Sequence, residues 1–239
     1  MLSLLASAHD VGVYGLAYKL LEVLVAYPAI YVGLLVPILA RAYHGDPPYY
    51  LDTLRSAFRV LAFIALPLFF GGLLLAKDII PLFGLGYGGS VPTLQILLGA
   101  TVMIFFGTLY ANALIVADRQ TALAKVYFCG MVANIAANLY AIPRWSYIGA
   151  AWTTLGTEAV VTVALALLLS KYGRFSAEFS RVPRILAACV VMAGVLYVVR
   201  GQSVIISLAA GAAVYAAASL AFRSVTRDEL TGLFKPKSS

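Results

Sequence analysis

The sequence predicts an all-α, polytopic integral membrane protein with about seven transmembrane helices. Of its 239 residues, 62% are hydrophobic and 11% are charged, whereas a soluble domain is about half apolar and about a quarter charged. The apolar residues form long blocks, many of them near the roughly 20 residues that cross about 30 Å of hydrocarbon. Blocks such as VVTVALALLLS lack the two-residue alternation of a barrel strand, so helices must satisfy the backbone within the membrane.

The expected spans follow the apolar blocks along the chain. The segment DIIPLFGLGYGGSVP, between the second and third spans, is expected to be a short interfacial or re-entrant segment on the outer side. Pro28 and Pro37 should kink the first span, and Pro67 the second. The approximate bounds of the spans are Val13 to Leu39, Val60 to Ala76, Val91 to Ile115, Ala122 to Ala141, Ile148 to Ser170, Val182 to Val199 and Val204 to Phe222.

These spans divide the chain into five parts. Residues 1–12 look like the remnant of a preceding helix or an outer segment, and residues 13–170 form a lobe of five helices. Residues 171–181 are a basic cytoplasmic loop, residues 182–222 supply two terminal transmembrane helices, and residues 223–239 are a basic cytoplasmic tail.

Basic residues alternate between the two sides of the predicted topology. The second, fourth and sixth loops hold one each, at Lys77, Arg144 and Arg200. Because cytoplasmic loops are rich in Lys and Arg, the amino terminus is expected outside and the carboxyl terminus in the cytoplasm, in a multi-pass protein of the cytoplasmic membrane. The net charge of +7 then reflects topology and contact with anionic membrane lipids, not nucleic-acid binding. The basic residues of the other connections are Arg41, Arg55, Arg59, Arg119, Lys125, Lys171, Arg174, Arg181, Arg184, Arg223, Arg227, Lys235 and Lys237.

The motifs of catalysis are missing from the sequence. It has no Gly-rich phosphate loop, no nucleophile elbow and no metal-ligand spacing. His9 and His44 fall on opposite sides of the predicted topology and cannot share a metal. We therefore expect a protein that is not an enzyme, with no catalytic, cofactor-binding or metal-binding residues.

Two charged residues lie well inside the first predicted span. Lys19 and Glu22 are three positions apart on one helical face, close enough to pair. Glu22 lies about 14 Å along the helix from its start, too deep for its short side chain to reach the interface. We expect the pair to face a protein cavity; in the alternative, Lys19 snorkels outward and Glu22 merely neutralises it.

Other spans also carry polar side chains. Glu158 lies near the middle of the fifth span, where a lone carboxylic acid can stay protonated, either as a quiet hydrogen-bonding group or as a proton-coupling group. Asn134 and Asn138 form a polar face on the fourth span, and Asn112 lies in the third. These amides line a substrate or ion path, or they only lock neighbouring helices together.

Three stretches, taken in order, resemble a known family. They are GVYGLAYKLLEVLVAYPAIYVGLLVPILARA, AKDIIPLFGLGY and NALIVADRQTALAKVYFCGMVANIAANLYAIPRWSYIGAAWTT. They resemble the carboxyl-terminal half of the polysaccharide and oligosaccharide-lipid flippases, within the multidrug, oligosaccharidyl-lipid and polysaccharide exporter superfamily. Tyr14 and Ala17 match a Tyr-x-x-Ala helix that ends at a proline, here Pro37, and Asn138 matches an asparagine before an IP…GAA turn.

The resemblance has departures, and it covers about residues 12–170. Trp145 and Ser146 stand where the family more often has a glycine, and Gly86 stands where an acidic residue often precedes the tyrosine. These departures concern the outer loops. Residues 13–170 are thus expected to form the carboxyl-terminal lobe of a flippase.

The resemblance implies a membrane exporter that moves a lipid-linked oligosaccharide or polysaccharide precursor to the outer leaflet, through a cavity between two lobes. Its drive would be an ion gradient or the membrane potential. Lys19 and, at the cytoplasmic mouth, Arg119 are candidates to bind the anionic head group, with Arg41 and Arg59 weaker ones. Glu158 is the candidate for proton or sodium coupling.

Because relatives carry a whole amino-terminal lobe, the chain is expected to be a half-transporter or a truncated gene product. As a half-transporter it would pair with a separate amino-terminal half or with a second copy. Two other interpretations stay open: a non-transporting membrane scaffold of a polysaccharide assembly complex, and a membrane-embedded enzyme of glycan assembly.

Overall fold

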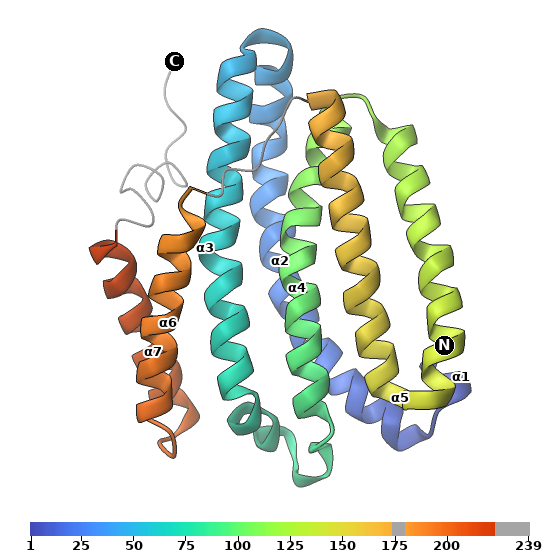
Figure 1. Ribbon diagram of the computed structural model, residues 1–239, viewed down its shortest axis with the longest axis vertical. Coiled ribbons are helices and arrows are strands. Elements are labelled where there is room, and N and C mark those ends of the chain that lie inside the picture. Colours follow the sequence, from blue (N-terminus) through green and yellow to red (C-terminus); the bar gives the residue numbers. More distant parts are fainter. Residues whose placement is uncertain (174–179, 223–239) are drawn as a thin grey trace.

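The structure, a computed structural model, describes residues 1–173 and 180–222 as a bundle of long helices (Figure 1). No strand occurs in this part of the chain, so the all-α prediction is confirmed. The centre of the predicted loop 171–181 and the whole predicted tail lie outside the described residues. The elements are α1 (Leu2–Leu5), α2 (Ala8–Gly45), α3 (Pro47–Ile79), the 3-10 helices η1 (Ile80–Phe83) and η2 (Leu85–Tyr87), α4 (Ser90–Val116), α5 (Gln120–Gly173), α6 (Val182–Val198) and α7 (Val204–Ala221).

The number of helical segments agrees with the prediction of about seven spans. Among the described residues, α2, α3, α4, α5 and α7 are long and apolar enough to cross a membrane, and α6 is a shorter apolar helix of 17 residues. The 54 residues of α5 turn back at Ser146, so this helix supplies two segments. We call residues 120–145 its first arm and residues 147–173 its second arm. The protein is a multi-pass membrane protein.

The connection between the first two spans is helical almost throughout. Helix α2 continues to Gly45 and α3 already begins at Pro47. Asp46 joins them, and its carboxylate accepts a hydrogen bond from the backbone N–H of Tyr49 at 3.1 Å. Pro47, at the first position of α3, needs no N–H partner. The 38 residues of α2 extend about 57 Å, more than the roughly 30 Å of hydrocarbon in a membrane. The hairpin of α2 and α3 extends past the ends of the other helices, and we call this the hairpin end (Figure 1).

The opposite end of the bundle, which we call the kink end, holds the bend of α5, the turn between α6 and α7, and the connection from α3 to α4 (Figure 1). The connection consists of η1 and η2, two short 3-10 helices, and not a re-entrant helix. The prolines of the first two spans do not end the helices: Pro28 and Pro37 lie within a continuous α2, and Pro67 within a continuous α3. Helix α2 changes direction between its first turns and the part beside α3 and α4 (Figure 1). Membrane helices tolerate proline where neighbours satisfy the freed backbone groups.

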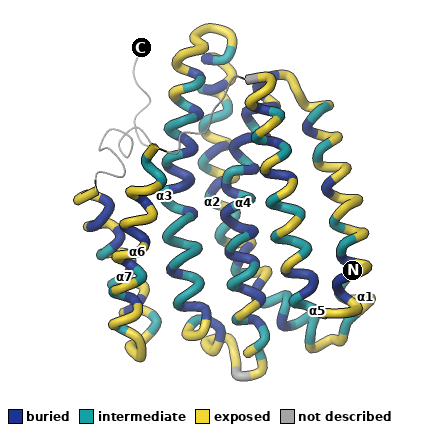
Figure 2. The backbone as a smooth tube through the Cα atoms, in the orientation of Figure 1, coloured by how far each residue is buried: buried dark blue, intermediate teal, exposed yellow. Residues whose placement is uncertain are grey.

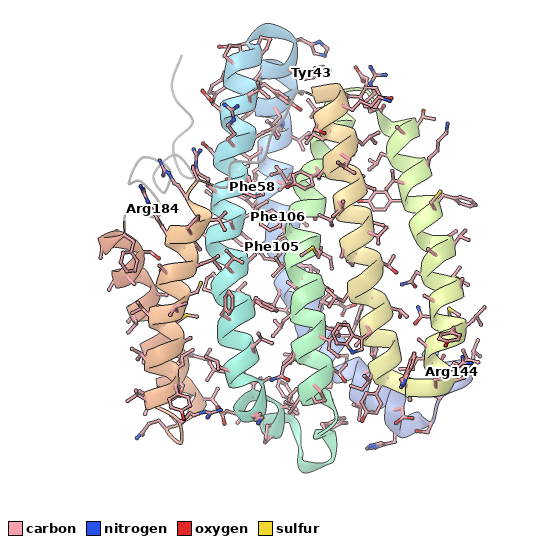
Figure 3. All side chains as sticks on the ribbon, viewed as in Figure 1. Tyr43, Phe58, Phe105, Phe106, Arg144 and Arg184 are labelled. Atoms are coloured by element: carbon pink, nitrogen blue, oxygen red, sulfur yellow. The ribbon has the colours of Figure 1, made fainter. Side chains whose placement is uncertain are left out.

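Helix α4 occupies the centre of the bundle. Within its most apolar stretch 61% of the residues are buried, against 17% for α2 (Figure 2). The rings of Phe58 and Phe106 stack with centroids 4.8 Å apart, and Phe105 of α4 lies 6.1 Å from Tyr27 of α2 (Figure 3). Close packing of this kind, with interhelical hydrogen bonds, is what holds membrane helices together.

Helices α6 and α7 lie against α3, on the side of the bundle away from α5 (Figure 1). The Tyr215 hydroxyl of α7 donates to the backbone oxygen of Phe63 in α3 at 2.7 Å. Cys189 and Met192 of α6 are buried in the same apolar cluster. The two terminal helices therefore leave the opposite flank of the molecule, formed by α2 and α5, free to carry a polar site.

The bend of α5 is held by Ser146 and Gly149. Ser146 has φ 45° and ψ −129°, in the region that favours glycine, and its hydroxyl donates to the Asp10 carboxylate of α2 at 2.8 Å. A Cβ on Gly149 would lie 2.5 Å from the backbone oxygen of Ala141, so only glycine lets the two arms come this close. The bend thus places the two arms side by side and ties them to the start of α2.

Candidate functional site

A polar pocket of about 580 Å³ opens between α2 and the two arms of α5. Figure 1 shows the first turns of α2 running obliquely across the kink end of α5 before the helix rises beside α3 and α4. This course brings the tyrosines of α2 to the pocket, while α1 lies at its edge. The polar residues that line the pocket are Tyr14, Tyr18, Tyr127, Asn134, Asn138, Thr154, Thr157 and Glu158.

A chain of four hydrogen-bonded side chains joins the two arms. The Thr153 hydroxyl donates to Asn138 Oδ1 at 2.7 Å, and Asn138 Nδ2 donates to Asn134 Oδ1 at 2.9 Å. Asn134 Nδ2 in turn donates to Thr157 Oγ1 at 3.0 Å. The two amides therefore lock the helices together, and both also line the pocket. The sequence left two roles open for these amides: the structure shows the interhelical lock, and a substrate or ion path stays a prediction.

Helix α2 contacts the second arm of α5 through Tyr14. Its hydroxyl lies 3.2 Å from Thr154 Oγ1, and Thr154 donates to the backbone oxygen of Ala150. The ring of Tyr14 stacks on that of Tyr18, one helical turn later, at 5.7 Å. Tyr18, Tyr127 and Thr153 were not predicted from the sequence to belong to the site. The i, i+4 spacing of Tyr14 and Tyr18 was the available signal.

Glu158 lines this pocket from the second arm of α5. It is partly buried, and within the described ranges no hydrogen bond or ion pair engages its carboxylate. The pocket therefore offers amide and hydroxyl oxygens together with a carboxylate. Such oxygen donors suit a proton or a small hard cation.

Lys19 and Glu22 lie on α2 but do not line this pocket. Both are exposed, and no ion pair joins them in the part of the chain that the structure describes, so the expected pairing is not formed. The i, i+3 spacing permits a contact, but no neighbouring element holds the two side chains together. The oblique start of α2 also makes 14 Å an upper bound on the depth of Glu22. We call the exposed side of α2 that carries Lys19 and Glu22 its open face.

Asn112 and Arg119 lie apart from the pocket. Asn112 Nδ2 donates to the backbone oxygen of Thr108, within its own helix, at 2.9 Å. Arg119 is exposed in the turn between α4 and α5, and its guanidinium lies 4.4 Å from the centre of the Tyr172 ring. Arg119 therefore lies at the hairpin end, and its place at a cytoplasmic mouth stays a prediction. The predicted site is thus spread over three places in the fold.

In residues 1–173 and 180–222, no three His, Cys, Asp or Glu side chains gather as a metal site would require. Cys189 is buried and Cys129 is exposed, on different helices. The polar pocket and the open face of α2 therefore remain as the candidate functional sites.

The arrangement defines a class of protein: a multi-pass helical membrane protein with the fold of a flippase-type transporter lobe. Among solved structures, the fold is similar to that of lipid II flippase MurJ in an inward closed conformation, with a TM-score of 0.76 and 15% sequence identity. The similarity covers 90% of this chain and 47% of that one, so the chain spans about half the length of this neighbour. No protein-family model matches the sequence, and no curated protein matches it.

Proposed function

We propose that the chain is one lobe of a flippase that moves a lipid-linked oligosaccharide or polysaccharide precursor across the cytoplasmic membrane, for cell-surface polysaccharide biosynthesis. The observation that carries this proposal is the fold similarity to a lipid II flippase over 90% of the chain. The order of sequence motifs supports it independently.

The open face of α2 supports a second lobe in the working transporter. Lys19 and Glu22 are exposed there, and a charged side chain within a membrane costs about 3 kcal/mol on insertion scales when lipid surrounds it. A facing lobe would replace that lipid with a polar cavity, where Lys19 can bind an anionic head group. We propose that this lobe is an amino-terminal half or a second copy of the chain.

The polar pocket supports an ion-coupled drive. Its amide and hydroxyl groups are already ordered by the hydrogen bonds between the two arms of α5, while the Glu158 carboxylate faces the same space. We propose that a proton or a cation binds here and that its gradient drives transport. Binding at the joint between the two arms and α2 would bias how these helices pack.

The first experiment tests export. In cells that make this protein, deletion of the gene should leave lipid-linked saccharide in the cytoplasmic leaflet, and the wild-type gene should restore export. Lys19→Leu should lower export about tenfold or more, the loss expected for one charge-assisted phosphate contact. Glu22→Gln should lower it less, because it removes no cation.

The control for this experiment is Lys77→Leu, which removes an exposed lysine at the end of α3 and should export normally. Membrane abundance of each variant is measured by immunoblot. Full export by Lys19→Leu would contradict the proposal and favour a non-transporting scaffold. A deletion strain that accumulates no lipid-linked saccharide would exclude a role in its export altogether.

The second experiment tests coupling at Glu158. In vesicles that contain the whole transporter, Glu158→Gln should uncouple transport from an imposed proton or sodium gradient while exchange without a gradient continues. Asp78→Asn is the matched control, because Asp78 is an exposed carboxylate at the kink end of α3, away from the pocket. Equal gradient dependence of the two variants would exclude Glu158 as the coupling group and leave the export proposal standing.

A further inference from the structure

A second hollow lies between the two arms of α5, and we call it the α5 groove. It has a volume of about 750 Å³ and runs from Gly130 and Val160 to Ala141 and Trp145 at the kink end. Gly130 and Thr157 line both this groove and the polar pocket. Apart from two threonines, the groove is lined by small, aliphatic and aromatic side chains. It is therefore an apolar hollow on the outside of the bundle.

The length of the α5 groove matches one leaflet of a bilayer. From Gly130 to Ala141 the first arm rises about 16 Å, close to half of the roughly 30 Å of hydrocarbon in a membrane. A partner transmembrane helix needs a contact surface along the whole thickness. A groove of this length instead fits an acyl chain of one lipid in the leaflet at the kink end.

The mouth of the groove carries a cation among aromatic rings. The Arg144 guanidinium lies 3.7 Å from the centre of the Tyr140 ring and donates to the Tyr140 backbone oxygen at 3.1 Å (Figure 3). The Trp145 ring lies 6.0 Å from that of Tyr140, and both residues line the groove and are more than half exposed. No acidic side chain in the described residues forms an ion pair with Arg144. Aromatic side chains with an exposed cation are typical of the head-group level of a membrane.

We propose that the α5 groove binds one anionic phospholipid of the bilayer, with an acyl chain between the arms of α5 and the head-group phosphate at Arg144. The charge of Arg144 selects an anionic head group over a zwitterionic one, and the depth of the groove selects a single chain. This lipid is a constituent of the bilayer, distinct from the proposed transported lipid. The proposal therefore does not depend on the proposed function.

The chain offers its own probe of the groove. Trp145 and Trp152 are its only two tryptophans, and both line the groove, so intrinsic fluorescence reports on this site. The full chain is reconstituted in phosphatidylcholine bilayers with a small fraction of phosphatidylglycerol that carries bromine on its acyl chains. Brominated phosphatidylcholine at the same fraction is the comparison. Phosphatidylglycerol should quench the tryptophans with about fivefold higher apparent affinity, the contribution of one basic residue near a head group.

Two substitutions separate the head-group contact from the chain contact. Arg144→Gln should abolish the difference between the two lipids. Gly156→Leu should lower quenching by both, because Gly156 lines the groove and a Cβ there meets no atom within 4 Å, so the larger side chain fills the groove without a clash. Arg144 is exposed, so its substitution should not affect folding.

Each substitution has a control. Arg200→Gln removes another kink-end arginine, which lies 5.0 Å from the ring centre of Tyr197. Gly194→Leu adds the same side chain at an exposed glycine of α6 that also has no atom within 4 Å of its Cβ. Neither control should change quenching. Equal quenching by both lipids in the wild type, or a lipid preference that survives in Arg144→Gln, would overturn the proposal; unchanged quenching in Gly156→Leu would place the lipid elsewhere.

Discussion

At the scale of single residues, Ser146 combines an unfavourable backbone conformation with a favourable side-chain contact. Its φ of 45° costs a residue with a Cβ about 1 kcal/mol relative to glycine. Its hydroxyl, in return, donates to the Asp10 carboxylate, and hydrogen bonds to charged groups are the stronger ones. A serine is therefore tolerated at this position, where the family that the sequence resembles more often has a glycine.

This balance predicts an order of stability at position 146. Ser146→Ala keeps the strained conformation and loses the hydrogen bond, so its melting temperature should fall. Ser146→Gly loses the same bond but relieves the strain, so its melting temperature should lie between those of Ser146→Ala and the wild type. Thermal unfolding of the three proteins in one detergent measures this order. A glycine variant less stable than the alanine variant would contradict it.

The sequence identified those residues of the polar pocket that are polar side chains within an apolar span. Asn134, Asn138 and Glu158 are polar side chains in apolar spans, which the sequence displays directly. Tyr18 and Tyr127 are not out of place in a membrane helix, so only the packing of α2 against α5 assigns them to the pocket. The contact between Lys19 and Glu22 was expected from spacing alone, but spacing permits a contact without stabilising it.

At the scale of elements, the bend of α5 depends on where glycines lie along it. Gly149 faces the backbone of Ala141, whereas Gly156 faces open space. Gly149→Ala should push the arms apart and destabilise the protein by about 1–3 kcal/mol, the usual cost of overpacking. Gly156→Ala should change stability little.

Yield of monodisperse protein and its melting temperature in detergent test this pair of variants. Both add one methyl group to the same helix, so Gly156→Ala controls for helix propensity. Equal behaviour of the two variants would mean that the close approach at Gly149 does not hold the bend.

The positions of the membrane spans were easier to predict than the ends of the helices. Apolar blocks located every span, because the membrane dictates about 20 apolar residues. The start of α3 at Pro47 could not be found in the same way, because residues beyond the hydrocarbon need no apolar side chains. There the helix boundary depends on Asp46 as a cap and on Pro47 at the first position, which are local signals within a charged stretch.

At the scale of the whole molecule, orientation in the membrane stays a prediction from the basic residues. A cysteine at Gly88, in the exposed connection at the kink end, should react with an impermeant thiol reagent added outside cells. A cysteine at Gly173, the last residue of α5, should not. Cys129 and Cys189 are first replaced by serine and alanine, and labelling after membrane permeabilisation is the control. The reverse pattern would invert the orientation and with it the proposed direction of export.

Thr157 lies in the thin wall between two hollows: it accepts a hydrogen bond from Asn134 and lines both the polar pocket and the α5 groove. Occupants of the two hollows would thus contact opposite sides of one side chain. Thermodynamic linkage then requires reciprocity: whatever factor a lipid in the groove contributes to the affinity of an ion in the pocket, the ion contributes to the affinity of the lipid. The composition of the bilayer would in that case set the ion concentration at which the proposed transporter works.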